Sequence, residues 1–539
     1  MEDKAKHIYR RLILVLLLAV GWFGGLYCGR QLTDNQLRFL LGDTTGNNKL
    51  SQTISIIEQA YIEPISRDSL IELAIPALIR ELDPHSVYLP PKELEVAEEP
   101  LKGEFDGIGV VFNMGTDTVL IMNVVPTGPS RKAGVLGGDR IVKVNDTLIS
   151  GVKMSQEEVM KRLRGPRGTK VKLSIERKGI EGLVDIEVTR DAIPLHSVDA
   201  AMMLTDKIGF IKLSQFSVTS YSEVMQALAS LRMQGMRSLI FDIRGNSGGF
   251  LDQAILIANE FLPFGKLIVY TKDRNDRQMR QYSDGRGSST DLNLAILIDE
   301  LSASSSEILA GALQDNDCGT IIGRRSFGKG LVQQQLPFYD GSALRLTVAR
   351  YFTPTGRSIQ KPYTAGEGDK YEYDIIDRFN RNEFFSADSI HFADSLRFTT
   401  PKGKVVYGGG GIMPDIFVPL DTMRVSKYYA EISGRNILYR YTIEYADLHR
   451  KELENVRTLN DIKHLLDNDK SLLNNFVRYA EQQGVKPSWE DINKEREIIE
   501  TQLRAYIARN TDLEDKAFYY FIRPIDRTML RAIEELEKQ

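Results

Sequence analysis

The chain has 539 residues, of which 42% are hydrophobic and 26% charged, and its formal net charge is −4. This length predicts roughly three or four domains, and the composition is typical of a folded soluble protein. Because no long basic stripe accompanies the slightly negative charge, nucleic acid is not expected as a partner. The two cysteines, Cys28 and Cys318, exclude a disulfide framework.

Residues 1–30 have the pattern of a cytoplasmic basic flank followed by a transmembrane anchor. Lys4, Lys6, Arg10 and Arg11 precede residues 12–29, a stretch of 18 residues without a charge. As a helix this stretch would span about 27 Å, enough for a bilayer core. The flank predicts a single-pass protein of a bacterial inner membrane, with its catalytic part on the periplasmic side. A cleaved signal peptide is the competing interpretation, although no Ala-x-Ala site follows.

Residues 31–99 are predicted to be helical, because apolar residues recur there at spacings of three and four. From residue 100 to 192 the pattern changes to short β runs at 110–112, 119–125, 141–144 and 171–175, with one helix at 156–163. Gly107, Ile108, Gly109 and Val110 form a loop that leads into a strand. Such a loop can present backbone N–H groups to a carboxylate, and the strand edge can accept a peptide. The block resembles a PDZ domain; a small β-rich domain without a ligand is the alternative.

Strands and helices alternate from residue 193 to 424, which predicts an α/β domain with a largely buried sheet. Strands are expected at 208–213, 238–243, 294–298 and 320–322, and helices at 221–232, 252–260 and 305–314. Residues 361–410 interrupt the alternation with charged and aromatic residues and are interpreted as an insertion. Residues 425–539 are predicted to be helical. One helix there would start at Ser488 and Asp491 and present an apolar face of Ile492, Ile499, Leu503, Tyr506 and Ile507.

A cluster of serines follows the strand expected at 294–298, in the run Ser-Ala-Ser-Ser-Ser-Glu at residues 302–307. Ser304 lies at a predicted helix start, where free N–H groups and the helix dipole favour the anion formed in acyl transfer. Ser304 and Glu307 also fit a capping box, which needs no catalytic explanation. The composition does not choose among the serines, so Ser302, Ser305 and Ser306 remain candidates for a nucleophile.

A glycine-flanked lysine, Lys329, offers the base that a serine nucleophile needs, because burial lowers the pKa of an amine. Gln333 lies four positions after Lys329 and could orient that amine or a water. A solvated loop lysine is the alternative. The run Asp-Ile-Arg-Gly-Asn-Ser-Gly-Gly at residues 242–249 adds paired glycines whose N–H groups could approach an oxyanion. Its alternative is a tight turn with Asp242 and Arg244 as a local ion pair.

Three motifs in this order resemble the C-terminal processing peptidases, or tail-specific proteases, over residues 50–420. They are Asp-x-Arg-Gly-Asn-x-Gly-Gly, Ser-Ala-Ser-x-Ser-Glu-Ile and Phe-Gly-Lys-Gly-x-Val-Gln, and the PDZ-like block precedes them. The resemblance implies Ser304 as the nucleophile, Lys329 as the general base and Gln333 as the residue that positions the lysine. It implies an oxyanion hole made by the N–H of Ser305 with that of Gly248 or Gly249. Ser305 replaces a common alanine, and Arg324-Arg325-Ser326 replaces the usual lead-in to the lysine.

The sequence therefore predicts a multidomain α/β and β protein: an α/β serine protease core with an inserted PDZ domain, a helical N-terminal region and a helical C-terminal extension. By resemblance it is a serine endopeptidase that recognises the C-terminal tails of proteins, without a metal, nucleotide or other cofactor. A catalytically inactive PDZ scaffold and a Ser-His hydrolase using His85 are the rivals. The sequence does not identify the physiological substrate, the preferred tail sequence or a regulator, and it leaves open whether the protein forms a homo-oligomer.

Overall fold

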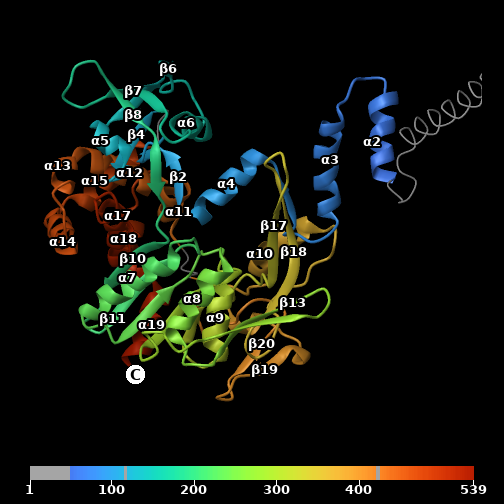
Figure 1. Cartoon of the computed structure of the whole chain (residues 1–539). Helices are drawn as coiled ribbons and strands as arrows, with labels where there is room; N and C mark the ends of the chain where they lie inside the picture. The colour runs from blue at the N-terminus through green and yellow to red at the C-terminus, as the bar shows by residue number, and fades with distance from the viewer. Residues whose placement is uncertain (1–48, 115–117, 421–424, 539) are drawn as a thin grey trace, which may run out of the picture. The chain divides into compact units, whose positions relative to one another are not determined.

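The computed structural model describes residues 49–114, 118–420 and 425–538. The chain divides into two compact units, residues 1–83 and 84–539, and each is described by itself. The predicted fold class is confirmed, because Figure 1 shows an α/β core, a β-rich domain and a helical C-terminal region, together with helices near the amino terminus.

The first unit contributes two helices, α2 (Lys49–Ala60) and α3 (Arg67–Arg80). Ser66 caps α3, since its hydroxyl accepts a hydrogen bond of 3.1 Å from the N–H of Ser69. The predicted membrane anchor at 12–29 lies outside the described residues. Within the described part of the chain, no helix is long and apolar enough to cross a membrane. The anchor and the periplasmic localisation stay predictions.

The second unit opens differently from the helical prediction for residues 31–99. A short strand, β1 (Val87–Leu89), pairs antiparallel with β18 (Ala343–Phe352), and α4 (Pro91–Lys102) follows it. Tyr88 and Leu89 are buried in this pairing. A strand of three residues is too short to produce a periodic pattern, so its partner, far along the chain, decides its conformation.

The β-rich domain is joined to the core through an antiparallel pair, β2 (Glu104–Gly107) with β9 (Asp191–Pro194). Its sheet has the strand order β3-β4-β5-β7-β8, with β6 beside β5, so β3 is an edge strand. The bounds are β3 (Val110–Asn113), β4 (Val119–Val124), β5 (Arg140–Val144), β6 (Thr147–Leu148), β7 (Lys170–Glu176), β8 (Leu183–Thr189), α5 (Pro129–Ala133) and α6 (Gln156–Leu163).

The core of the second unit is a six-stranded sheet in the order β10-β11-β12-β15-β16-β21. All its pairings are parallel except β10 with β11, and its central strands are buried on both faces. The bounds are β10 (Val198–Met203), β11 (Ile208–Leu213), β12 (Ser238–Asp242), β15 (Asn293–Ile298), β16 (Thr320–Gly323) and β21 (Ile416–Phe417).

Helices cover both faces of this sheet (Figure 1). One face packs against α7 (Ser220–Met233), α8 (Leu251–Phe261) and α9 (Ser305–Asp315). The opposite face packs against the last helix of the chain, α19 (Arg527–Glu537), whose Met529, Ala532 and Leu536 contact Ile240 and Leu297. A segment from the far end of the sequence thus completes the core.

A second sheet, which the alternation pattern does not indicate, lies beside the first. It has the order β1-β18-β13-β14, with β17 also paired to β18. The strands are β13 (Leu267–Asp273), β14 (Gln278–Tyr282) and β17 (Leu331–Pro337). The β17–β18 hairpin places Gln333 opposite Thr347.

The predicted insertion at 361–410 contains α10 (Gly368–Asn380), the two 3-10 turns η1 (Ala387–Ser389) and η2 (Asp394–Leu396), and the strand pair β19 (Arg397–Thr399) with β20 (Val405–Tyr407). The Gly-rich stretch at 408–411 returns to the core, where the N–H of Ser326 donates to the carbonyl of Ile412 at 3.0 Å.

The C-terminal region is helical, as predicted, and has its own apolar core. Its elements are α11 (Lys427–Gly434), α12 (Ile437–Leu448), α13 (Arg450–Leu453), α14 (Leu459–Asn468), α15 (Leu472–Gln482), α16 (Trp489–Lys494), α17 (Arg496–Arg509), α18 (Glu514–Ile522) and the turn η3 (Arg523–Ile525). The single helix predicted to start at Ser488 is wrong. Ser488 does cap α16, but that helix ends at Lys494, and the apolar face continues on α17.

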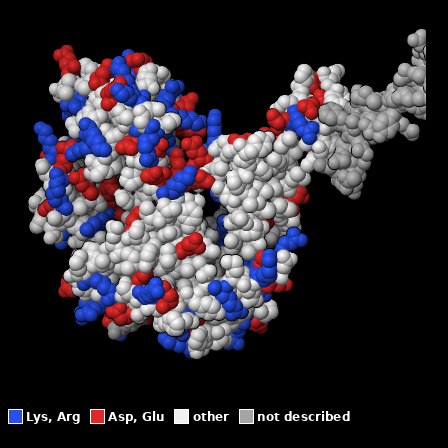
Figure 2. All heavy atoms as spheres, viewed as in Figure 1, with Lys and Arg blue, Asp and Glu red and all other residues white. Residues whose placement is uncertain are grey.

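The helical region also contacts the β-rich domain. Charged side chains of both signs lie side by side over the upper left of the face drawn in Figure 2, whereas the centre of that face is largely uncharged. One ion pair, Arg140 with Asp447 at 2.8 Å, joins the two parts, and Asn123 donates to Glu514 at 3.2 Å. The guanidinium of Arg450 packs so closely on Gly138 that a Cβ there would lie 2.4 Å from its Nε. The β-rich domain is therefore held by the C-terminal region as well as by the β2–β9 pair.

Shortening Met529 to alanine should destabilise the second unit, because its side chain is fully buried between α19 and the sheet. Large-to-small changes at such sites cost about 2–5 kcal/mol. The matched control Met233→Ala removes a methionine that is 85% exposed and should change stability by less than about 0.5 kcal/mol. Urea denaturation measures both. Equal midpoints for the two variants would contradict the packing of α19 as an integral part of the core.

Candidate active site

The serine turn lies between β15 and α9, where the buried strand ends and the helix begins. Ser304 occupies the position before the first helical residue, with φ of 56° and ψ of −114°. A positive φ is strained for any residue but glycine, and such strain gathers at functional sites because the surrounding structure must enforce it. Ser304 is half-buried, whereas its serine neighbours are buried.

The hydroxyls of three neighbouring serines are engaged with the backbone. They donate at 2.8–2.9 Å to three carbonyls: Ser302 to Ile243, Ser305 to Gly249, and Ser306 to Asn246. Within the described residues, the hydroxyl of Ser304 donates to no backbone carbonyl. In the capping box of α9 the side chain of Ser304 accepts from the backbone N–H of Glu307, so Ser304 is the member of the cluster whose hydroxyl proton is not used to hold the turn.

A buried carboxylate, that of Glu307 in the first turn of α9, ties the serine turn to the lysine loop (residues 325–330). One oxygen accepts the N–H of Ser304 at 2.9 Å and the N–H of Lys329 at 2.8 Å. The other accepts the N–H of Gly328 at 2.7 Å and the hydroxyl of Ser326. The predicted capping contact of Glu307 is thus present, and the same carboxylate also holds a loop more than twenty residues away.

The pKa of the Glu307 carboxyl depends on two opposing effects, burial and hydrogen-bond donors. Burial raises the pKa of its carboxyl to about 7, while the hydroxyl of Ser326 and three backbone N–H groups favour the ionised form. The hydroxyl of buried Tyr351 adds a second link, because it contacts the carbonyls of both Ser304, at 3.1 Å, and Lys329. The backbones on either side of the candidate site are therefore fixed relative to one another.

The glycine loop at 244–249 lies directly against the serine turn. A Cβ on Gly248 would lie 2.8 Å from the Cβ of Ser304, and both Gly248 and Gly249 have positive φ, 107° and 143°. Only glycine allows this approach. The N–H of Gly248 donates to the side chain of Asn246 at 2.8 Å. Of the predicted oxyanion donors, the N–H groups of Gly249 and Ser305 are those that donate to no other described residue.

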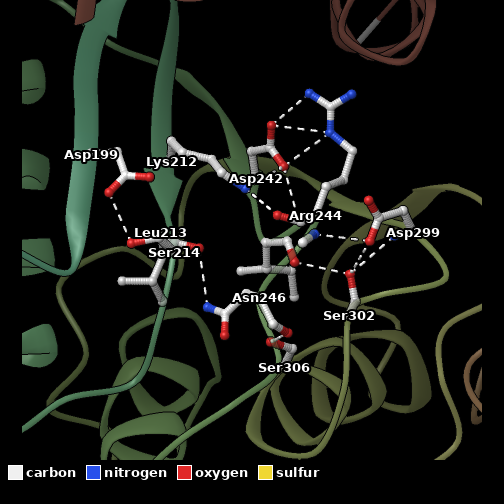
Figure 3. A network of polar contacts seen from close by, with 12 residues as sticks. Asp199, Lys212, Leu213, Ser214, Asp242, Arg244, Asn246, Asp299, Ser302 and Ser306 are labelled. Atoms are coloured by element: carbon white, nitrogen blue, oxygen red, sulfur yellow. Dashed lines mark hydrogen bonds and ion pairs between the residues drawn. The ribbon is translucent and has the colours of Figure 1, made fainter. Parts of the chain in front are cut away.

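An ion-pair network lies at the start of this loop (Figure 3). The buried carboxylate of Asp242 pairs with Arg244 at 2.6 Å and lies 3.5 Å from the amine of Lys212. Burial opposes ionisation of Asp242, but these two cations outweigh it and hold its pKa below the usual range. The predicted local pair of Asp242 and Arg244 is present, and it extends to Asp526 at the start of α19, 2.8 Å from Arg244.

Lys329 and Gln333 lie on successive segments, the lysine loop and strand β17. Lys329 is half-buried, and its role as the base stays a prediction. The amide of Gln333 donates to the hydroxyl of Thr347 across the hairpin at 3.3 Å. Gln333 is thus held by the second sheet rather than by the lysine loop, and its role in positioning the lysine stays a prediction.

The remaining predicted groups lie elsewhere. His85 contacts the hydroxyl of Tyr371 at 2.9 Å, a partner in the insertion, rather than a serine of the cluster. Gly107 ends β2, where it pairs with Asp191 of β9, and Val110 begins the edge strand β3, so the predicted peptide loop of Gly107, Ile108, Gly109 and Val110 connects the β2–β9 pair to the edge of the second sheet of this domain. In the described part of the chain, no group of three or more His, Cys, Asp or Glu side chains could hold a metal ion.

The sequence did not indicate the connecting roles of Tyr351, Asp526 or Glu307. Glu307 was signalled only through its capping box, and Tyr351 only through its place in a family motif. Asp526 carries a helix-capping signal, because its side chain accepts the N–H of Met529 at 3.0 Å. None of these local signals reveals a partner distant in the chain.

Replacing Glu307 with glutamine should abolish a pH dependence of stability. Folding raises this pKa from 4.5 to about 7, so the folded state holds the proton more tightly than the unfolded state. The stabilisation is therefore complete below about pH 4.5 and is lost as the pH rises to about 7. The urea midpoint of the wild type, relative to Glu307→Gln, should fall over this window and stay constant above it. Parallel curves for the two proteins would contradict the raised pKa.

Three segments of the chain match known protein families. Residues 207–367 match peptidase family S41, residues 107–188 match a PDZ domain, and residues 428–511 match DUF8443, a family of unknown function. A solved photosystem II D1 C-terminal processing protease is 25% identical, with 69% of this chain and 87% of that chain covered and a TM-score of 0.37.

Two bacterial relatives are more similar in sequence. The carboxy-terminal processing protease CtpA of Bacillus subtilis is 34% identical over 315 residues, 58% of this chain and 66% of that protein. The carboxy-terminal-processing protease of Bartonella bacilliformis is 37% identical over 309 residues, 56% of this chain and 70% of that protein. The chain therefore belongs to the C-terminal processing proteases of peptidase family S41.

Proposed function

We propose that the chain is a serine endopeptidase that binds the C-terminal tail of a protein substrate and cuts a nearby peptide bond with Ser304 and Lys329. The observation that carries the proposal is the hydroxyl of Ser304, which donates to no backbone carbonyl of the described residues and lies in a strained turn tied to the lysine loop through Glu307. The alternative of an inactive scaffold is not favoured, since the family's Ser, Lys and Gln positions are all occupied by the expected residues.

In this mechanism Ser304 Oγ attacks the scissile carbonyl as Lys329 Nζ accepts its proton. The carbonyl oxygen becomes an oxyanion, for which the N–H groups of Ser305 and Gly249 are the donors available near the turn. Collapse expels the leaving amine, which takes the proton from Lys329, and leaves an acyl-enzyme on Ser304. Water, deprotonated by the same amine, then hydrolyses the ester and restores the serine.

Recognition of the tail is assigned to the PDZ domain. Its edge strand β3 has one free side on which an extended peptide could add, and the loop before it could receive the terminal carboxylate. The domain is attached to the core through β2 and β9, so a bound tail would be tethered close to the protease. Tethering raises the effective concentration of the neighbouring substrate segment at the site.

Removal of the nucleophile or the base should abolish turnover. Ser304→Ala removes the attacking oxygen, and Lys329→Ala removes a general base worth about 10²–10⁴ in kcat. Cleavage of an unfolded protein with an apolar C-terminal tail, followed by electrophoresis and mass spectrometry, measures both. Undiminished turnover by Ser304→Ala would refute the assigned nucleophile.

Two matched variants control for indirect effects. Lys370→Ala removes a lysine whose side chain is 77% exposed and should leave kcat unchanged. Ser306→Ala removes a neighbouring hydroxyl that only supports the backbone of Asn246, and it should retain much more activity than Ser304→Ala. A Ser306→Ala enzyme as inactive as Ser304→Ala would move the nucleophile within the cluster.

Amidation of the substrate tail should weaken recognition. Loss of the terminal carboxylate removes charge-assisted hydrogen bonds worth about 1.5–3 kcal/mol, or about 10- to 100-fold in affinity. We expect KM to rise by this factor for an amidated tail, while kcat changes little. Fluorescence anisotropy of labelled tails on Ser304→Ala measures binding directly. Equal affinity for the free and amidated tails would contradict recognition of the C-terminus.

A further inference from the structure

The insertion at 361–410 is packed directly on the lysine loop, residues 325–330. The loop lies outside any helix or strand, between β16 and β17. No ladder of regular hydrogen bonds therefore fixes it, and its position depends on contacts with other segments. Glu307 supplies one set of these contacts, and the insertion supplies another.

Arg378 on helix α10 makes the most direct contact. Its guanidinium is 1% exposed and donates to the carbonyl of Ser326 at 3.0 Å and to that of Arg325 at 2.7 Å. Glu383, also in the insertion, lies 3.4 Å from Arg378 and pairs with Arg325 as well. A buried guanidinium held between a carboxylate and two carbonyls has little freedom, because its donors have a rigid geometry.

A second group of contacts holds the other end of the loop. The N–H of Lys361 donates to the carbonyl of Gly328 at 2.9 Å. The ammonium of Lys361 lies 4.0 Å from the ring centres of both Phe327 and Tyr371, which places a cation between two aromatic faces. Asp374 of α10 accepts from the same ammonium at 3.0 Å.

Tyr371 extends this support to the residue after the lysine. The N–H of Gly330 donates to the side chain of Gln360 at 2.7 Å, and the amide of Gln360 donates to the Tyr371 hydroxyl at 3.2 Å. The same hydroxyl contacts His85 at 2.9 Å. Residues on both sides of Lys329 are therefore connected, through at most one side chain, to α10.

We infer that α10, chiefly through Arg378, is a positioning element that holds Lys329 in register with Ser304. The inference rests on the proposed function, and it assigns to the insertion a role in the rate of the chemical step. A base misplaced by about 1 Å can cost about 100-fold in rate, since proton transfer needs hydrogen-bond geometry. Substrate binding at the PDZ domain does not involve these contacts and should be unaffected.

Replacement of Arg378 with methionine in the full chain tests the inference. We expect kcat on a tailed protein substrate to fall about 100-fold while KM stays within about twofold. The pH profile of kcat should also change, because Lys329 would have different surroundings. Added guanidinium, but not ammonium, should restore part of the activity of Arg378→Ala by occupying the vacated space.

Arg381→Met is the matched control. Arg381 lies just beyond the same helix and pairs with the same Glu383 at 3.0 Å, but its side chain is 54% exposed and bonds no carbonyl of the lysine loop. Its kcat should equal that of the wild type. A fall in kcat equal to that of Arg378→Met would show a general loss of the insertion rather than positioning through Arg378, and would overturn the inference.

Tyr371→Phe covers the case in which Arg378→Met does not fold. It removes one hydroxyl without changing the packing, and we expect kcat to fall about tenfold with an unchanged melting temperature. If Arg378→Met folds and has the kcat of the wild type, the inference is overturned. If Arg378→Met does not fold, a wild-type kcat in Tyr371→Phe overturns it. Ser304→Ala separates this failure from failure of the proposed function, because only the latter leaves Ser304→Ala active.

Discussion

The arrangement of the site depends on one buried carboxylate. Glu307 has no exposed surface, so its oxygens must be satisfied within the protein, and four donors from two segments satisfy them. The cost of leaving any of these donors or acceptors unpaired is what keeps the serine turn and the lysine loop together. The serine turn and the lysine loop are therefore joined through their backbone N–H groups, independently of any contact between the side chains of Ser304 and Lys329.

Segments from distant parts of the chain also contact the loops on either side of Glu307. The insertion supports the lysine loop through Arg378, and the last helix supports the glycine loop through the pair of Asp526 with Arg244. The C-terminal region that carries Asp526 also contacts the PDZ domain, through Asp447 and Arg140. Two regions that the three family motifs do not cover thus contact the protease core.

The buried α/β sheet could be predicted because its strands are continuous apolar runs and its helices are amphipathic. The expected strand at 208–213 coincides with β11, and the expected helix at 305–314 ends one residue short of α9. The second sheet could not be predicted in the same way. Strand β14 is exposed along its whole length, and β17 has three consecutive glutamines at its centre, so neither alternates regularly between apolar and polar residues. Pairing with β13 and β18 decides their conformation.

The sequence by itself determined the family, the order of the domains and the residue types at the site, because these depend on motifs that are contiguous in the chain. The resemblance already pointed to Ser304, and only the tertiary structure showed that the hydroxyls of its three neighbours donate to backbone carbonyls. It also showed that the N–H of Gly248 is already bonded to Asn246 and that Glu307 reaches Lys329. Hydrogen bonds between distant segments leave no periodic trace in a sequence, since each partner satisfies only its own local pattern.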